Sequence, residues 1–341
     1  MKIVTFTKRL IKKTCLKIMF PGKDSLLQES FLKEAWHFFK QTEKYNASVQ
    51  TDEDIEKMQY TILRDNHVIE KGMSMRNPRK GFGQEKVYNL LLRLNKYYIS
   101  YGNTDLKFLE YPLSTIKTYI EYTENQGVQI DDIKSKFEEL VKLSSLEITT
   151  HAGIVKVYKK DIQNQCNTDY ESLLTSRHSI RYFSDEPVNK EQIIKALQLA
   201  QRTPSACNRQ GWKTHVFQGD ESVRLMRWQG GCNGFEEELQ NSILVTANLK
   251  AFLSYEVHQC YIDGGLYSMN LINALHSLGL GCIPSSCGFY KDKLNKIKDF
   301  GIPEHEVPIV IIAFGNLQNE FNIAVSTRKD ISVTNTFHNY K

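Results

Sequence analysis

The sequence lacks the features that would indicate a membrane span, a disulfide scaffold or a metal site. Near the amino terminus, basic residues interrupt every apolar run well short of the roughly 20 residues that a spanning helix needs. The seven cysteines are odd in number, include no CxxC pair and follow no regular spacing. Cys282 and Cys287 lie close together but lack companion ligands, so we expect no metal. These absences predict a cytoplasmic protein.

Acidic residues are absent from the first 23 positions. The whole chain of 341 residues carries a net charge of only +5, which does not call for nucleic acid, and we expect none. In residues 1–23, basic and apolar residues alternate, which predicts a basic amphipathic segment. Residues 1–20 either contact an anionic membrane surface peripherally or pack as a basic helix on the body of the protein.

Proline is scarce between residues 24 and 150, a region rich in Lys, Glu, Tyr and Leu. Apolar residues recur there at helical spacing, as in the run Val87, Leu90, Leu91, Leu94, Tyr97 and Tyr98. We therefore predict a mainly helical N-terminal domain over residues 24–150, followed by a polar linker over residues 151–168.

One segment of this helical domain is distinctive, the stretch from His67 to Gly83. A helix is expected to end at Gly72, and a new helix to begin near Gln84. The loop between them carries several glycines and the basic residues Arg76, Arg79 and Lys80. It is either an anion-binding loop or a solvated turn. His67 has only Glu70 as a near carboxylate, and such a pair by itself is a weak indication of a metal site.

Residues 169–341 alternate between helical and strand patterns. Short apolar runs predict buried strands at 214–217, 242–247 and 308–315, and helices are expected at 193–200, 222–228 and 261–278. Asn189 and Gln192 are spaced as a capping pair for the first of these helices. The pattern predicts an α/β sandwich, a mixed sheet flanked by helices.

Two polar segments of this second half carry its chemistry, Arg177 to Asp185 and Thr203 to Trp212. Arg177, Ser179 and Arg181 alternate on an extended segment, so their side chains are expected to project to one side. Guanidinium groups bind phosphate and other anions, whereas hydroxyl and amide groups suit a polyhydroxyl chain. The two segments together therefore favour an oriented, phosphate-bearing cofactor.

These segments resemble the flavin-binding signature of the FMN-dependent nitroreductase family, over about residues 169–341. The resemblance implies an α+β sandwich that forms a homodimer with FMN at the interface. By position, Arg177 resembles the phosphate arginine, and His178 and Ser179 resemble contacts to the ring edge and ribityl chain. Arg181 resembles a basic residue at the N1/O2 edge of the flavin ring, where its charge stabilises anionic reduced flavin. The resemblance further assigns cofactor binding to Pro204, Ser205, Asn208, Gln210 and Asn233.

Two later segments extend the resemblance. Residues 279–288 resemble the glycine-rich turn that covers one face of the ring, with contacts from Pro284, Ser285, Ser286 and Gly288. The expected donor to flavin N5 is the amide of Ser285 or Ser286. Ser326 to Arg328 resembles the C-terminal phosphate clamp, although Ser326 stands where a lysine is common. Arg328 keeps the guanidinium, and the adjacent Lys329 offers a further positive charge.

The function implied by the resemblance is that of an FMN-dependent NAD(P)H oxidoreductase. Hydride passes from NADH or NADPH to flavin N5, and a small organic acceptor then takes the electrons in a ping-pong cycle. No catalytic side chain is assigned, and Arg181 is the electrostatic candidate. A lid is expected over residues 226–238, where Trp228 and Phe235 either stack on substrates or pack in the core. The alternative function is a flavin-binding sensor or assembly protein that is recruited through its N-terminal half.

Overall fold

The computed structural model describes residues 35–36, 55–149, 151–253, 256–289 and 291–338. The basic segment 1–23 lies outside the described residues. Chain contacts divide the rest into two compact units. The sheet unit contains residues 165–177 and 183–316, and the helical unit contains the described parts of residues 50–164, 178–182 and 317–341.

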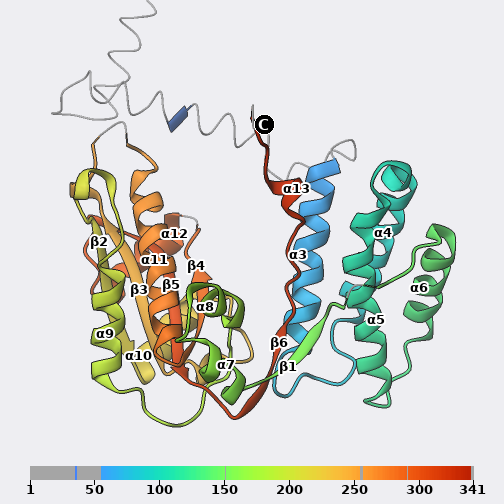
Figure 1. The fold of residues 1–341 in the computed structure, drawn as a ribbon, viewed down its shortest axis with the longest axis horizontal. Coiled ribbons are helices and arrows are strands. Elements are labelled where there is room, and N and C mark those ends of the chain that lie inside the picture. Colours follow the sequence, from blue (N-terminus) through green and yellow to red (C-terminus); the bar gives the residue numbers. More distant parts are fainter. Residues whose placement is uncertain (1–34, 37–54, 150, 254–255, 290, 339–341) are drawn as a thin grey trace, which may run out of the picture. The chain divides into compact units, whose positions relative to one another are not determined.

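The sheet unit is built on a four-stranded sheet with the order β2-β3-β5-β4 (Figure 1). Its strands are β2 (Trp212–Gln218), β3 (Asn241–Asn248), β4 (Leu280–Ser286) and β5 (Glu306–Asn316). The three strands predicted from apolar runs correspond to β2, β3 and β5 and are confirmed. The α+β class is confirmed as well, and the neighbouring pairs of this sheet are all antiparallel, which refines the expected mixed sheet.

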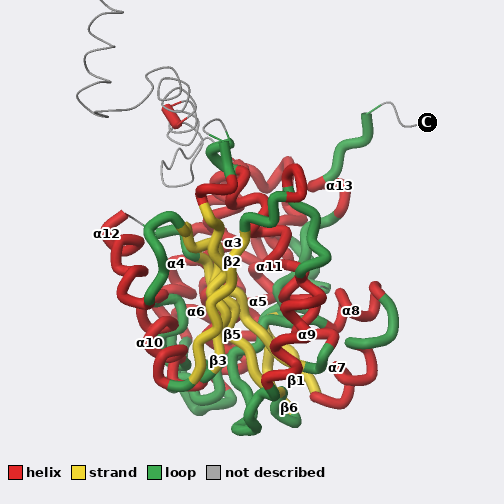
Figure 2. The backbone as a smooth tube through the Cα atoms, turned by 90° about the vertical axis from the view of Figure 1, so that its left-hand side faces the viewer, coloured by secondary structure: helices red, strands yellow, loops and turns green. Residues whose placement is uncertain are grey.

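Helices cover this sheet on both sides, with α9 and α11 on one side and α10 on the other (Figure 2). The helices of the unit are α8 (Tyr170–Ser176), α9 (Lys190–Ala200), α10 (Asp220–Gln229), α11 (Gln259–Ser277) and α12 (Lys291–Leu294). Short 3₁₀ turns are η2 (Ala206–Asn208), η3 (Glu236–Glu238), η4 (Leu249–Ala251) and η5 (Asn295–Phe300). The predicted capping pair is confirmed, because Asn189 and Gln192 form a reciprocal capping box at the start of α9.

The core of the sheet unit forms where α9 and α11 pack against the sheet. Ile243, Ile312 and Phe314 of the strands are fully buried there together with Leu271 and Leu275 of α11. Trp212 stacks on Tyr267 with ring centroids 4.8 Å apart, which fixes β2 against α11. This packing sets the position of the N-terminal end of α11 and the carboxyl end of β4.

In its described residues, the helical unit contains the long helices α3 to α6, shorter helical segments and a small antiparallel β-ribbon. The helices are α3 (Ile55–Met73), α4 (Gln84–Asp105), η1 (Leu106–Leu109), α5 (Glu110–Glu124), α6 (Asp131–Ser144), α7 (Lys159–Gln165) and α13 (Ile331–Thr334). The predicted apolar stripe of α4 is confirmed, with Val87, Leu90, Leu91, Leu94 and Tyr97 buried. The loop after α3 needs its glycines, because Gly81 and Gly83 have φ angles of 62° and 72°. Among the described helices, none is long and apolar enough to cross a membrane.

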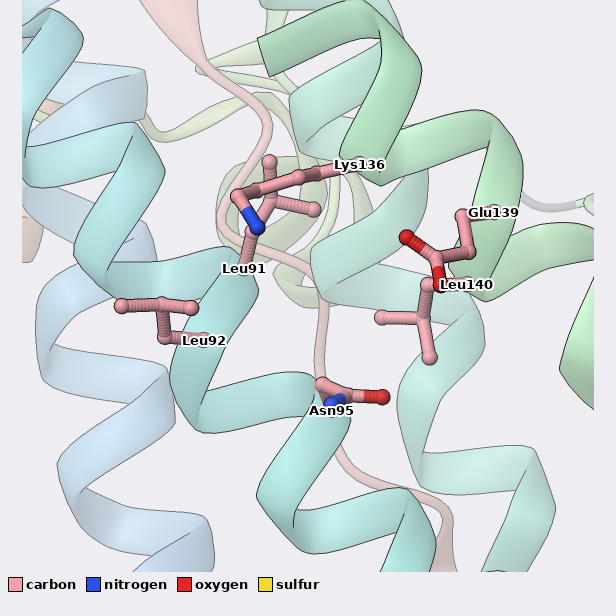
Figure 3. A pocket seen from close by; sticks show the side chains of 6 residues that line it. All are labelled: Leu91, Leu92, Asn95, Lys136, Glu139 and Leu140. Carbon is pink, nitrogen blue, oxygen red and sulfur yellow. The ribbon is translucent and has the colours of Figure 1, made fainter. Parts of the chain in front are cut away.

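A small cavity of about 50 Å³ remains between α4 and α6 (Figure 3). Leu91 and Asn95 of α4 and Lys136 and Leu140 of α6 line it. Because small-molecule sites have volumes of about 300–1,000 Å³, this cavity is too small for a nucleotide or a flavin. It is a packing gap within the helical unit.

Regular structure occupies the stretch 151–168, where we expected a linker. β1 (Ile154–Tyr158) and α7 fall within it. β1 pairs with β6 (Glu320–Ala324), in a register that runs from Ile154 opposite Ala324 to Tyr158 opposite Glu320. The C-terminal segment therefore groups with the helical unit rather than with the sheet that precedes it.

Replacement of Ile312 by alanine tests the core of the sheet unit. The side chain is fully buried on the central strand β5, so we expect Ile312→Ala to lower the free energy of unfolding by about 2–5 kcal/mol. Urea denaturation of the full chain measures this loss. Ile194→Ala on α9, where the isoleucine is 44% exposed, is the matched control and should cost below about 0.5 kcal/mol. Equal losses in the two variants would contradict the assigned core.

Candidate flavin site

Arg177 stands at the end of α8 and belongs to the sheet unit. The preceding residue, Ser176, is hydrogen-bonded to His276 of α11, with 2.8 Å between Oγ and Nε2. Burial raises the pKa of the Cys282 thiol on β4 to about 12, and the positive charge of Arg177 opposes that rise. Arg177 is therefore close enough to β4 to influence the pKa of Cys282. Its side chain is half-buried.

The next residues, 178–182, belong to the helical unit. Arg181 is only 6% exposed, and its Nη1 donates to the Oγ of Ser74 at 3.4 Å. The guanidinium of Arg76 lies 4.8 Å from the ring centroid of Tyr182. The loop that follows α3 thus contacts the segment that contains the predicted flavin residues His178, Ser179 and Arg181.

The loop of residues 204–210 is exposed and conformationally unusual. Cys207, Asn208 and Gln210 have φ angles of 50°, 54° and 50°, a left-handed region that non-glycine residues seldom adopt. Ser205 Oγ accepts a hydrogen bond of 2.9 Å from the Gln210 amide, and the Gln210 side chain donates to Asn208 Oδ1 at 3.1 Å. Such backbone strain is concentrated at functional sites, where the surrounding structure enforces it.

Carboxylates of the sheet unit enforce this loop conformation. Asp263, buried on α11, accepts from the Ala206 amide at 3.2 Å. Arg209 forms a bidentate pair with Glu256, with both N–O distances 2.7 Å. Hydrogen bonds from Arg209 and from the Leu253 amide lower the pKa of Glu256 to about 2. Since this carboxyl is charged at every pH well above that value, the pair persists throughout the neutral range.

The segment 284–288 is mostly strand rather than turn. We expected a glycine-rich turn over residues 279–288, but residues 280–286 form β4, an edge strand paired with β5. Proline is tolerated at such an edge when its nitrogen faces away from the neighbouring strand. The backbone nitrogens of Pro284 and Ser286 face the same way, because the backbone groups of successive residues alternate in direction along a strand. The Ser286 carbonyl accepts from Gln229 Nε2 of α10 at 3.0 Å, so the Ser286 backbone points away from β5.

A cavity of about 1280 Å³ opens where β4 ends. Cys287, Gly288 and Phe289 line it, together with residues from the start of α11 such as Cys260 and Tyr261. The wall is mainly apolar with a few polar groups, which is typical of sites for organic ligands. Of the residues predicted to bind the cofactor, Gly288 is the one that lines this cavity.

Three further predicted residues lie in α10 or in the loop that follows it. Asn233 is exposed in the loop between α10 and η3. Phe235 is only 2% exposed, which favours core packing over stacking on a substrate. Trp228 packs edge-on against Phe289, with ring centroids 5.1 Å apart.

Arg328 is exposed in the helical unit, and its guanidinium donates to the Ser326 carbonyl. The backbone of Thr327 is hydrogen-bonded to Tyr111 of α5. The Oγ1 atom of Thr327 is buried without a hydrogen-bond partner among the described residues. Lys329 lies with its Nζ 4.2 Å from the ring centroid of Tyr60, so this neighbouring charge is held on α3.

Among the described residues, no three His, Cys, Asp or Glu side chains gather in a way that suits a metal ion. Cys282 and Cys287 are buried free thiols, and burial raises the pKa of each to about 12. They are therefore protonated at neutral pH, and neither is a thiolate ligand or nucleophile there.

Comparison with known proteins gives this geometry a family. Residues 174–316 match the model of the nitroreductase family. These residues form a nitroreductase-family domain. A protein of Methanothermobacter thermautotrophicus named "Putative NADH dehydrogenase/NAD(P)H nitroreductase" is 28% identical over 173 residues, which cover 50% of this chain and 84% of the relative. A protein of the same name from Archaeoglobus fulgidus is 26% identical over 149 residues, or 43% of this chain and 85% of the relative.

Solved structures resemble about half of the chain. One from Exiguobacterium sibiricum, described as a "putative nitroreductase in complex with FMN", is 21% identical with a TM-score of 0.44, and covers 50% of this chain and 98% of its own. A nitroreductase-like family protein from Bacillus cereus is 19% identical with a TM-score of 0.43, and covers 51% of this chain and 99% of its own. The family match covers residues 174–316, and the helical residues 55–149 lie outside it.

Sequence reasoning did not single out the residues that support the predicted site. Ser74, Glu256 and Asp263 contact site segments that lie 107, 47 and 57 residues away in the chain. A local pattern carries no signal of contacts over such separations. Of the three residues, Ser74 alone lies in a segment that the sequence marks as distinctive, the stretch His67–Gly83.

Replacement of Glu256 by glutamine tests how the loop 204–210 is held. We expect Glu256→Gln to remove the charged pair with Arg209, so that the loop opens more often and trypsin cleaves faster after Arg209. Mass spectrometry of brief tryptic digests of the folded protein measures this cleavage. Glu221→Gln, which breaks the exposed pair with Arg224, is the control. An unchanged rate of cleavage after Arg209 would show that the pair does not hold the loop.

Alkylation of the folded protein tests the burial of the thiols. We expect iodoacetamide at neutral pH to leave Cys282 and Cys287 unmodified and to label both once the protein is unfolded in guanidinium. Peptide mass spectrometry gives the extent of labelling at each cysteine. Rapid labelling of either thiol in the native protein would contradict its placement.

Proposed function

We propose that the chain is an FMN-dependent NAD(P)H oxidoreductase that reduces a small organic acceptor. The observation that supports this most is the Ser286 backbone, directed outward at the edge of β4 beside a cavity lined by Gly288. An outward N–H there suits flavin N5, which supports Ser286 as the donor that we propose. The nitroreductase names of the curated relatives agree with this chemistry.

Each unit carries donor groups that suit FMN. Arg177 and Arg328 supply guanidinium groups for the phosphate, and Thr327 offers a buried hydroxyl that has no partner among the described residues. Ser205, Asn208 and Gln210 supply hydroxyl and amide groups on a loop held in one conformation. Arg181 supplies a largely buried positive charge, which suits the ring edge that becomes negative on reduction.

Bound FMN would supply the redox chemistry, accepting hydride from NAD(P)H and passing electrons to the acceptor. The protein's own groups bind and orient the reactants. The apolar wall of the cavity would exclude water around the reacting groups, and the Ser286 amide would donate a hydrogen bond to flavin N5. Protons can come from solvent, and no side chain is assigned as acid or base. His178, Ser179, Pro204, Ser285 and Asn233 remain proposed contacts to the cofactor.

A homodimer is part of the proposal. Ile262, Leu266 and Met269 recur at helical spacing on one face of α11 and are 52%, 49% and 41% exposed. An apolar face of this kind on a long helix marks an interaction surface. A second copy of the chain is the partner that the family resemblance implies, and no nucleic acid is expected.

Anaerobic titration tests the reductase directly. The purified full-length protein, supplied with FMN, is expected to be yellow and to lose its flavin absorbance within seconds of adding NADH or NADPH. A protein that holds flavin but is not bleached would favour the sensor or assembly role. A protein that takes up no FMN would overturn both.

Arg177→Ala tests the phosphate assignment. Loss of a charge-assisted contact to phosphate is expected to weaken FMN binding about 10- to 100-fold, so most flavin is lost on purification. Flavin content per protein, measured by absorbance, checks this. Arg224→Ala removes an exposed arginine of α10 that pairs with Glu221 and should keep its flavin. Full retention of flavin by Arg177→Ala would show that Arg177 does not bind the phosphate.

A further inference from the structure

The helical unit contacts two of the segments to which the proposed function assigns flavin binding. Residues 178–182 and the C-terminal residues from 317 onward group with it rather than with the sheet unit. The contacts come from the loop after α3 and from α5, which lie outside the nitroreductase-family match. Each contact is made by one side-chain hydroxyl group.

Ser74, the first residue after α3, makes the first contact. Its hydroxyl donates to the Lys71 carbonyl at 2.9 Å, which turns an oxygen lone pair towards other donors. Arg181 Nη1 approaches that oxygen at 3.4 Å. Both side chains are nearly removed from water, with Ser74 3% and Arg181 6% exposed. The hydroxyl therefore acts as an acceptor that holds a buried guanidinium.

Tyr111 is the contact of α5. Its hydroxyl donates to Glu70 Oε2 at 2.9 Å, and the backbone of Thr327 is hydrogen-bonded to the same hydroxyl group. Glu70 is fully buried, and its other oxygen accepts from the Gly153 amide at 3.2 Å. Burial and the negative charge of Glu70 raise the pKa of Tyr111 well above its usual value, so the hydroxyl keeps its proton. The peptide before Arg328 is thereby tied to a buried, proton-bearing network.

We propose that two residues of the helical unit position predicted flavin-binding groups of the same unit: Ser74 positions Arg181 for the ring edge, and Tyr111 positions the Thr327–Arg328 segment for the phosphate. This rests on the proposed function. Long arginine side chains lose rotamer entropy when they bind, and a charge held in place beforehand avoids that cost at the moment of reduction. Ser74 and Tyr111 act through their neighbours and are positioning residues.

Substitution of Ser74 tests the ring-edge half of the proposal. Loss of the hydroxyl in Ser74→Ala is expected to weaken the binding of reduced FMN about tenfold more than that of oxidised FMN, which makes the midpoint potential of bound flavin more negative. Ser74→Thr keeps the hydroxyl and should restore the wild-type potential. Ser144→Ala removes a similar local bond, from Ser144 Oγ to the Val141 carbonyl at 3.1 Å, and is the control.

Substitution of Tyr111 tests the phosphate half. Tyr111→Phe is expected to weaken FMN about threefold to tenfold while riboflavin binding changes little, because riboflavin has no phosphate. Tyr98→Phe, which removes a 2.7 Å bond to the Leu143 carbonyl, is the matched control. Thermal melts of all variants establish that they are folded, and the Ser74 variants carry the test if Tyr111→Phe does not fold.

The outcomes separate the two proposals. A wild-type protein that takes up no FMN overturns the proposed function and this inference with it. A wild-type protein that binds and reduces FMN, with unchanged midpoint potential in Ser74→Ala and an unchanged ratio of FMN to riboflavin affinity in Tyr111→Phe, overturns this inference alone.

Discussion

The burial of one guanidinium group, that of Arg181, is the constraint on which the organisation of the helical unit depends. A charge removed from water costs several kcal/mol unless oxygen atoms replace its hydration. The loop after α3 supplies one such oxygen through Ser74, and its Arg76 covers the ring of Tyr182 next to Arg181. A short segment that follows α8 in sequence is thereby fixed to a loop that lies 107 residues earlier in the chain.

The pairing of β1 with β6 fixes the C-terminal segment to the helical unit. It joins residues 154–158 to residues 320–324 through backbone hydrogen bonds, and Tyr111 holds the peptide a few residues later. Within the helical unit, the residue after α3 contacts the segment of Arg181, and Tyr111 of α5 contacts the segment of Arg328.

The sequence predicted the elements whose signal is local. The capping box at Asn189 and the buried strands β3 and β5 follow from short-range patterns, and the structure confirms them. β1 escaped prediction because five residues with little alternation gain their stability from a partner more than 160 positions away. β4 was taken for a turn because glycine and proline usually break strands, whereas an edge position tolerates them. The chemical groups of the candidate site were visible in the sequence, but the carboxylates and hydroxyl groups that hold them were not.

Hydrogen exchange of the full-length protein with and without FMN tests the central claim most directly, because it reports on each segment separately. The account predicts that FMN slows exchange in residues 178–181, 205–210 and 285–288, and leaves the amides of α6 unchanged. Binding of FMN with protection confined to other segments would contradict it, since the flavin would then occupy a different site.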